Sequence, residues 1–178
     1  MNLQLLPIGK LNSRLLTSLA PAMANTFGIP CEIMSAALDP DFAYHRERQQ
    51  YHSSEILSRM QGMLAPKTWR LLGVAAVDLY IPILTFVFGE AQIGGMCAVV
   101  SLHRLQQEFY GLPEDAGLLH ERLLKESVHE IGHTLNLTHC DDYRCAMAPS
   151  HAVEWIDLKD SALCPSCHGR IFETTPPR

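Results

Sequence analysis

Residues 124–140 read LKESVHEIGHTLNLTHC, and the spacing within this stretch decides the fold around it. Its apolar residues Leu124, Val128, Ile131 and Leu135 recur at intervals of four, three and four. Such spacing draws one apolar stripe along an α-helix, which packs that stripe against a core. We therefore predict a long helix over Asp115–Leu135, ending by about residue 136.

The same helix carries two histidines, His129 and His133, four residues apart. Side chains four apart project from one face of a helix, so both imidazoles can reach one ion. A catalytic zinc site has three protein ligands and leaves a fourth position for water. Glu130 follows the first histidine, and its carboxylate can take a proton from that water. The alternative is a surface helix that carries two histidines by chance. A third ligand would distinguish a zinc site from this alternative.

His139 is the candidate third ligand, but it comes six residues after His133 and cannot continue the same helical face. To bring its ring back to the ion, the helix must stop near Asn136 and the chain must reverse. A residue in the left-handed conformation makes such a stop; glycine is the usual one and asparagine the next best. We therefore predict a catalytic zinc site of His129, His133 and His139, with Asn136 at the turn.

A second cluster follows directly, with Cys140 and Cys145 as one close pair and Cys164 and Cys167 as another. Four thiolates in two close pairs are typical of a closed, tetrahedral structural zinc site. Such a site would also tether His139, the neighbour of Cys140. We therefore expect two Zn²⁺ ions per chain, one catalytic and one structural.

Two other interpretations of the cysteines stay open. The stretch CPSCH at 164–168 matches the pattern of covalent haem attachment, which would leave Cys140 and Cys145 without a role. Disulfides would require an oxidising compartment. Cys31 and Cys97 are isolated, and we expect them to be buried apolar side chains.

From His129 to His139 the chain resembles the metzincin metallopeptidase pattern H-E-x-x-H-x-x-G-x-x-H, with Asn136 in place of its glycine. The following C-x4-C-x-M and C-x-x-C resemble the archaemetzincin family in particular. That family has seventeen residues between the methionine and the last pair, and this chain has sixteen, 148–163. The stretches FVFGEA at 86–91 and VVSL at 99–102 are also similar to that family.

The resemblance implies further roles around the zinc. Met147 would form the Met-turn, a soft apolar floor beneath the imidazoles. Residues 148–155 would form one wall of the pocket beyond the scissile bond, with Ser150 making no additional contact to the metal. The edge strand above the cleft would pair with an extended peptide. The candidate for this substrate-binding edge strand consists of Met96, Cys97, Ala98, Val99, Val100 and Ser101.

Two functions from different classes are compatible with these residues, and a different zinc hydrolase would use the same ligands. The first is a zinc-dependent metallopeptidase that hydrolyses peptide bonds with a zinc-bound water activated by Glu130. The second is a zinc-stabilised module that binds peptides or protein partners with little or no turnover. Glu130 favours the enzyme, because a purely structural zinc has no use for a base beside an open coordination position.

Upstream of the long helix, the apolar pattern predicts an α/β fold. It favours a mixed, twisted sheet with an antiparallel edge strand and two or three backing helices, one of them the zinc-binding active-site helix. Helices are expected over Leu11–Phe27 and Asp41–Met63. Strands are expected over Leu3–Ile8, Cys31–Ala37, Trp69–Leu79, Leu84–Phe88 and Met96–Leu102.

After Asn136 the chain is short and irregular, with at most one short helix near Asp157–Leu163. We therefore divide it into an N-terminal α/β catalytic subdomain (residues 1–139) and a small C-terminal subdomain (residues 140–178) held together by the Cys₄ zinc. The 178 residues are 47% apolar and 19% charged, a composition that can form an ordinary core.

Charge and apolar pattern exclude two classes of partner. The net charge is -5 and no basic run occurs, so no nucleic-acid partner is expected. The longest apolar stretch, Val74–Phe88, contains Asp78 and Pro82 and is shorter than the roughly 20 residues that span a bilayer. Together with the lack of a signal-like N-terminus, this predicts a monomeric, cytoplasmic protein with a peptide or protein substrate and no membrane partner.

Overall fold

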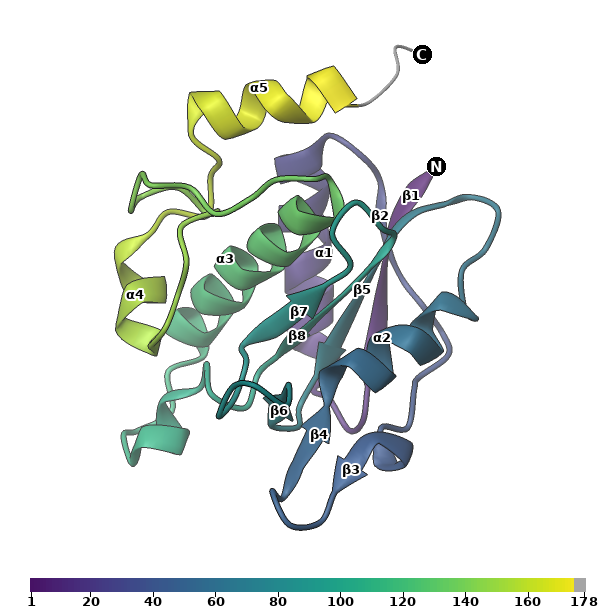
Figure 1. Ribbon diagram of the computed structural model, residues 1–178, viewed down its shortest axis with the longest axis vertical. Coiled ribbons are helices and arrows are strands. Elements are labelled where there is room, and N and C mark those ends of the chain that lie inside the picture. The colour runs from purple at the N-terminus through teal and green to yellow at the C-terminus, as the bar shows by residue number, and fades with distance from the viewer. Residues whose placement is uncertain (175–178) are drawn as a thin grey trace.

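A computed structural model describes residues 1–174 and places a five-stranded sheet at the centre of the molecule (Figure 1). The strand order is β2-β1-β5-β8-β7. The first four strands are parallel and β7 runs antiparallel to β8, which confirms the mixed sheet with an antiparallel edge. The strands are β1 (Asn2–Ile8), β2 (Cys31–Ile33), β5 (Thr68–Ala75), β7 (Gly89–Ala91) and β8 (Cys97–Ser101).

Helices cover both faces of this sheet (Figure 1). Helices α1 (Ser13–Phe27) and α3 (Ala116–Thr134) pack on one face, and α2 (Ser53–Gln61) packs on the other. Along β8, Ala98 and Val100 enter the core beneath α1 and α3, whereas Cys97 and Val99 enter the core beneath α2. A strand buried on both faces explains why this stretch is a continuous apolar run.

Helix α3 matches the predicted active-site helix. Asp115 caps its N-terminus by accepting a hydrogen bond from the backbone N–H of Leu118 at 2.9 Å. The buried Leu123, Val128 and Ile131 hold the helix against the sheet and α1. This packing fixes the position of the residues at its C-terminal end, where the candidate site lies.

The expected single helix over Asp41–Met63 is wrong. A 3₁₀ turn (Asp41–Ala43) leads into a hairpin of β3 (Tyr44–His45) and β4 (Gln50–His52), and only then does α2 begin. β4 also pairs with the short β6 (Leu79–Tyr80) to make a second, three-stranded sheet. Gln49 has φ 55°, so the backbone leaves the helical conformation at the hairpin turn.

The expected strand over Leu84–Phe88 is also wrong. This segment is irregular apart from one bridge between Val87 and Leu79. Side chains from elsewhere bind two of its carbonyl groups, so these two take no part in a strand ladder: Arg48 donates to the oxygen of Leu84 and Gln50 to that of Thr85. A second 3₁₀ turn (Gln107–Tyr110) precedes α3.

Met96–Ser101 does not form the edge of the sheet. Its strand, β8, lies between β5 and β7, with hydrogen-bonded neighbours on both sides, and the edge strand is β7. The physical reason is backbone pairing, because β8 pairs with β5 on one side and with β7 on the other.

The C-terminal part is more helical than expected. Instead of one helix near Asp157–Leu163, it contains α4 (Val153–Leu158) and α5 (Pro165–Thr174). Val153 and Ile156 anchor α4 in the core beneath α3. Pro165 stands at the first position of α5, where a backbone N–H would have no partner within the helix, so proline costs no hydrogen bond there. Within residues 1–174, none of the helices has the length and apolar character needed to cross a membrane.

Candidate active site

The C-terminal end of α3 brings the three predicted histidines together. Candidate ligand atoms of His129, His133 and His139 all lie within 4.8 Å of one another. The helix ends in a Schellman-type turn, in which the N–H of Leu137 donates to the Gly132 carbonyl at 3.1 Å and that of Asn136 to the His133 carbonyl at 3.1 Å. Asn136 has φ 63°, the left-handed conformation that sends the chain back over the helix.

Hydrogen bonds orient two of the rings. Nδ1 of His129 lies 2.9 Å from the carbonyl oxygen of Ala146, and Nδ1 of His133 lies 2.8 Å from that of Leu137. Because a carbonyl oxygen can only accept, each Nδ1 must carry the proton and each Nε2 presents a lone pair. The two Nε2 atoms lie 3.1 Å apart. Two facing lone pairs at this distance repel each other unless a cation lies between them.

Burial also favours the metal-binding form of all three histidines. Desolvation lowers the pKa of His129 well below its ordinary value and lowers the pKa of His133 and His139 as well. The imidazoles therefore stay neutral at neutral pH, and a neutral imidazole is the form that binds zinc. The chemistry of this donor set fits a zinc ion with three nitrogen ligands.

Glu130 lies against the edge strand at Gly89. A Cβ atom at Gly89 would come within 2.7 Å of the Glu130 carboxylate, so the absence of a side chain there makes room for it. Burial raises the pKa of Glu130 well above its ordinary value, the negative charge of Glu126 adds to this, and Lys159 opposes it. A divalent cation at the histidines would favour the carboxylate form.

The sequence did not point to Glu126 or Lys159. Lys159 Nζ lies 2.7 Å from a carboxylate oxygen of Glu126, and the side chains are only 1% and 3% exposed. The ammonium also donates to the Ala148 carbonyl at 3.2 Å, which ties the segment after Met147 to α3. The only available signal was that Glu126 stands four residues before Glu130, on the same helical face.

A cleft with a volume of about 530 Å³ opens above these residues. One wall is the segment 81–93, and another part of the lining consists of Pro149, Ser150 and His151, which belong to the segment predicted as a pocket wall. Glu90 and His151 also line the cleft. His151 belongs to the segment predicted as a wall, whereas Glu90 had no predicted role because it lies at no ligand spacing in the sequence. The floor is formed by the histidines together with Glu126 and Glu130.

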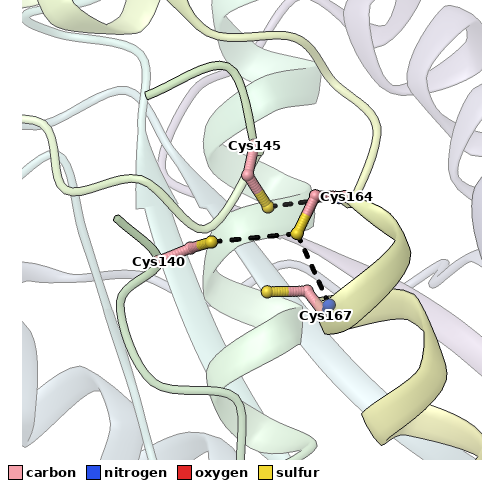
Figure 2. Close-up of side chains that lie close together, drawn as sticks. All are labelled: Cys140, Cys145, Cys164 and Cys167. Atoms are coloured by element: carbon pink, nitrogen blue, oxygen red, sulfur yellow. Dashed lines mark hydrogen bonds between the residues drawn. The ribbon is translucent and has the colours of Figure 1, made fainter. Parts of the chain in front are cut away.

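The four cysteines converge in a second cluster, shown in Figure 2. Their sulfur atoms all lie within 4.8 Å of one another, and those of Cys140 and Cys164 are 3.8 Å apart. A tetrahedral zinc with Zn–S bonds of about 2.3 Å separates its sulfurs by roughly 3.8 Å, so the spacing fits this metal. None of the six cysteines, each within residues 1–174, forms a disulfide bond. The gathering of all four favours a metal site over disulfides or haem attachment.

Backbone N–H groups support the sulfur atoms. The N–H of Cys164 donates to the sulfur of Cys145 at 3.3 Å, and that of Cys167 donates to the sulfur of Cys164 at 3.5 Å (Figure 2). The N–H of Met147 also donates to the sulfur of Cys145, at 3.4 Å. Such bonds stabilise negative sulfur, which is the ligating form.

Met147 lies between the two clusters. Its sulfur packs against Gly132 of α3, where any Cβ atom would collide with it. Its carbonyl accepts a hydrogen bond from the N–H of Cys140 at 3.0 Å, and it shares a small apolar core with Leu137 and Cys145. The chain segment that carries the cysteines is thereby packed against the turn that carries His139.

The chain is similar to known proteins over most of its length. A family model described as Peptidase family M54 matches residues 19–173. The archaemetzincin of Methanocaldococcus jannaschii is 42% identical over 161 residues, which cover 90% of this chain and 87% of that protein. The chain belongs to peptidase family M54.

Solved structures support the M54 assignment. The crystal structure of archaemetzincin from Archaeoglobus fulgidus, complexed with malonate, has a TM-score of 0.82 at 36% identity and covers 96% of this chain and 99% of its own. A zinc-dependent peptidase from Methanocorpusculum labreanum has a TM-score of 0.86 at 28% identity, covering 96% and 100%. This M54 peptidase is therefore a zinc metallopeptidase of the archaemetzincin family, as the resemblance predicted.

Proposed function

We propose that this M54 peptidase hydrolyses peptide bonds with Glu130 as the general base and holds two zinc ions. The catalytic ion would be bound by His129, His133 and His139, and the structural ion by the four cysteines. When bound at the histidines, zinc supplies Lewis-acid polarisation of the scissile carbonyl and lowers the pKa of water. The observation that carries the proposal is that two Nε2 lone pairs converge at 3.1 Å beside a buried carboxylate in an open cleft.

Glu130 would move the proton in this reaction. Its carboxylate lines the cleft beside the histidines, where it can accept a proton from the attacking water and then donate it to the leaving nitrogen. Gly89 allows the carboxylate to lie directly against β7. A substrate backbone next to β7 would therefore bring its scissile bond close to this group.

The peptide would bind along β7 (Gly89–Ala91). This strand ends the sheet order, and within residues 1–174 one of its edges pairs with no other strand, so that edge can pair with another extended chain. Pairing of backbone groups supplies affinity, and alternate side chains enter pockets that supply specificity. β7 thus takes the role that the sequence had assigned to Met96–Ser101. Met147, packed under α3, would serve as the Met-turn floor of the site.

The test is the substitution Glu130→Gln, compared with Glu121→Gln at an exposed position of the same helix. Hydrolysis of fluorogenic peptides by E130Q should fall by roughly 10²–10⁴-fold, because general-base catalysis contributes on that order. Zinc content, measured by elemental analysis, should stay at two ions per chain in both variants.

Two results would contradict the proposal. If E130Q and E121Q hydrolyse peptides equally well, Glu130 is not the base. If the zinc-loaded wild type binds peptides but cleaves none of them, a binding module without turnover describes the protein better.

A further inference from the structure

The cleft has an apolar wall that contains no regular strand along most of its length. Ile81, Leu84, Phe86 and Phe88 line the same cavity as the histidines, and Leu84 is 48% exposed. Residues 82–88 form turns and bends, with a single bridge at Val87. The shape of this wall is therefore not set by a strand ladder, and other contacts must hold it.

Arg48 and Gln50 bind the wall from the β3–β4 hairpin. Arg48 Nη2 donates to the carbonyl oxygens of Leu84 at 2.7 Å and Thr85 at 3.1 Å. Gln50 Nε2 donates to the same Thr85 oxygen at 3.0 Å, and its own amide oxygen accepts from Arg48 Nε at 3.1 Å. Two consecutive carbonyl groups of the wall are thus fixed by side chains that are distant in sequence.

Arg104 extends this network to the face of the wall. Its guanidinium binds the carboxylate of Asp78 through two hydrogen bonds of 2.7 and 2.8 Å, and Asp78 also accepts from Gln50 at 3.0 Å. The same guanidinium stacks 4.2 Å from the ring centroid of Phe86. A two-point Arg–carboxylate contact fixes the plane of the guanidinium, and through it the orientation of the aromatic ring.

We infer that Arg48 and Arg104 are positioning residues that hold segment 81–88 as the specificity wall of the cleft, selecting peptides with a large apolar side chain. This inference rests on the proposed function, because it names the substrate class of the same cleft. A Leu or Phe side chain of the substrate gains burial against Leu84 and Phe86. A Lys or Asp side chain would instead lose hydration without gaining a partner on these apolar residues.

The first experiment measures the wall without any substrate. Hydrogen exchange is compared in Arg48→Met, Arg104→Met and the control Arg59→Met, whose guanidinium stacks on Phe42 away from the cleft. The amide of Val87, bonded to the Leu79 oxygen at 2.9 Å, should exchange at least tenfold faster in R48M, while amides of β5 stay unchanged. Equal exchange at Val87 in R48M and R59M would overturn the positioning role.

The second experiment measures selection by binding, so it does not depend on turnover. Fluorescein-labelled Ala/Gly octapeptides, each with Leu, Phe, Lys or Asp scanned through its positions, are titrated by anisotropy against zinc-loaded E130Q. At its best position, Leu or Phe should bind on the order of tenfold tighter than Lys or Asp. This ratio should fall to about two in E130Q/R48M and E130Q/R104M and stay near tenfold in E130Q/R59M.

The outcomes separate the inference from the proposed function. A ratio near one in E130Q, a ratio that R48M and R104M leave unchanged, or no detectable binding overturns the inference. A tenfold ratio that both variants abolish supports it. Failure of the wild type to hydrolyse peptides while this ratio persists would contradict the proposed function and leave the inference standing.

Discussion

The two ligand clusters use neighbouring residues, His139 and Cys140, but lie in very different surroundings. The histidines form the floor of an open cleft of about 530 Å³ and have carboxylates beside them. The cysteines are packed with Leu137, Met147 and Leu163 in a small apolar core, and backbone N–H groups point at their sulfurs. An open site leaves room for water and substrate, whereas a closed one serves stability.

The comparison also shows how the clusters depend on each other. The carbonyl of Ala146 orients His129, and its neighbours Cys145 and Met147 belong to the cysteine core. The predicted boundary between subdomains, at residues 139 and 140, therefore falls between two segments that share hydrogen bonds. We propose that the structural zinc positions the catalytic ligands.

The largest expected effects come from removing one ligand of each cluster. Cys164→Ser should release the structural zinc, whose apparent binding free energy in such sites is about 10–16 kcal/mol, and should abolish peptidase activity as well.

His133→Ala should release the catalytic zinc and abolish activity while leaving the cysteine site filled. Elemental analysis should find two ions in the wild type and one in H133A, with thermal unfolding changed far more by C164S. If C164S keeps full activity, the proposed coupling is wrong.

A smaller effect is expected at the buried ion pair that lies beside the catalytic cluster. Lys159→Met leaves the Glu126 carboxylate without its cation at 3% exposure, and such a loss costs about 3–5 kcal/mol. The double variant Glu126→Leu/Lys159→Met should recover most of that stability. Urea unfolding measures both.

The nearby pair Arg144–Asp160 provides the matched control. Its side chains are 64% and 53% exposed at 3.1 Å, so Arg144→Ala should cost less than about 1 kcal/mol. If K159M is no more destabilised than R144A, the pair does not tie the cleft wall to α3.

The sequence predicted those parts of the site that depend on residues close together in the chain. The spacing of His129 and His133 fixes a helical face, and Asn136 was expected at a left-handed stop because a helix can end there in only a few ways. The convergence of the four cysteines was expected from their spacing in two close pairs. The roles of all these residues as zinc ligands remain predictions.

The sequence was misleading where contacts between residues far apart in the chain decide the structure. An apolar run such as Met96–Ser101 looks the same whether its strand lies at the edge or in the middle of a sheet, because strand order depends on distant partners. The apolar run Leu84–Phe88 suggested a strand, but most of it forms the irregular cleft wall. Glu126 and Lys159 are 33 residues apart, so no local pattern connects them.

A substitution at Gly132, which packs against the sulfur of Met147, should have an intermediate effect on stability. Gly132→Ala places a Cβ atom where the Met147 sulfur lies, so the methionine must shift beneath the histidines. Such overpacking costs typically about 1–3 kcal/mol, and zinc affinity at the histidines should fall with it. Gly169→Ala is the control, because a Cβ atom there meets nothing within 4 Å and alanine favours the helix. Equal unfolding curves for the two variants would show that Met147 has room to adjust.

The smallest expected effect is the pH dependence of the zinc-free protein's stability, which concerns the histidine cluster alone. The pKa of His129 is lowered by burial, so below its ordinary value of about 6.5 the unfolded chain binds more protons and stability falls as the pH falls. The pKa of Glu130 is raised by burial, so above about 4.3 the folded chain holds the extra proton and stability falls as the pH rises through the raised value.

The two slopes oppose each other between these limits, which makes Glu130→Gln informative without any zinc. Removing the carboxyl group removes the opposing slope, so stability of zinc-free E130Q should fall more steeply below pH 6.5 than that of the wild type. The difference should reach at most about 1.4 kcal/mol per pH unit, the value for one proton. Urea unfolding at pH 5, 6, 7 and 8 measures it. The stability of His129→Asn should instead fall less than that of the wild type as the pH is lowered, because one histidine with a lowered pKa is gone. If E130Q runs parallel to the wild type, Glu130 does not titrate with a raised pKa in the zinc-free protein.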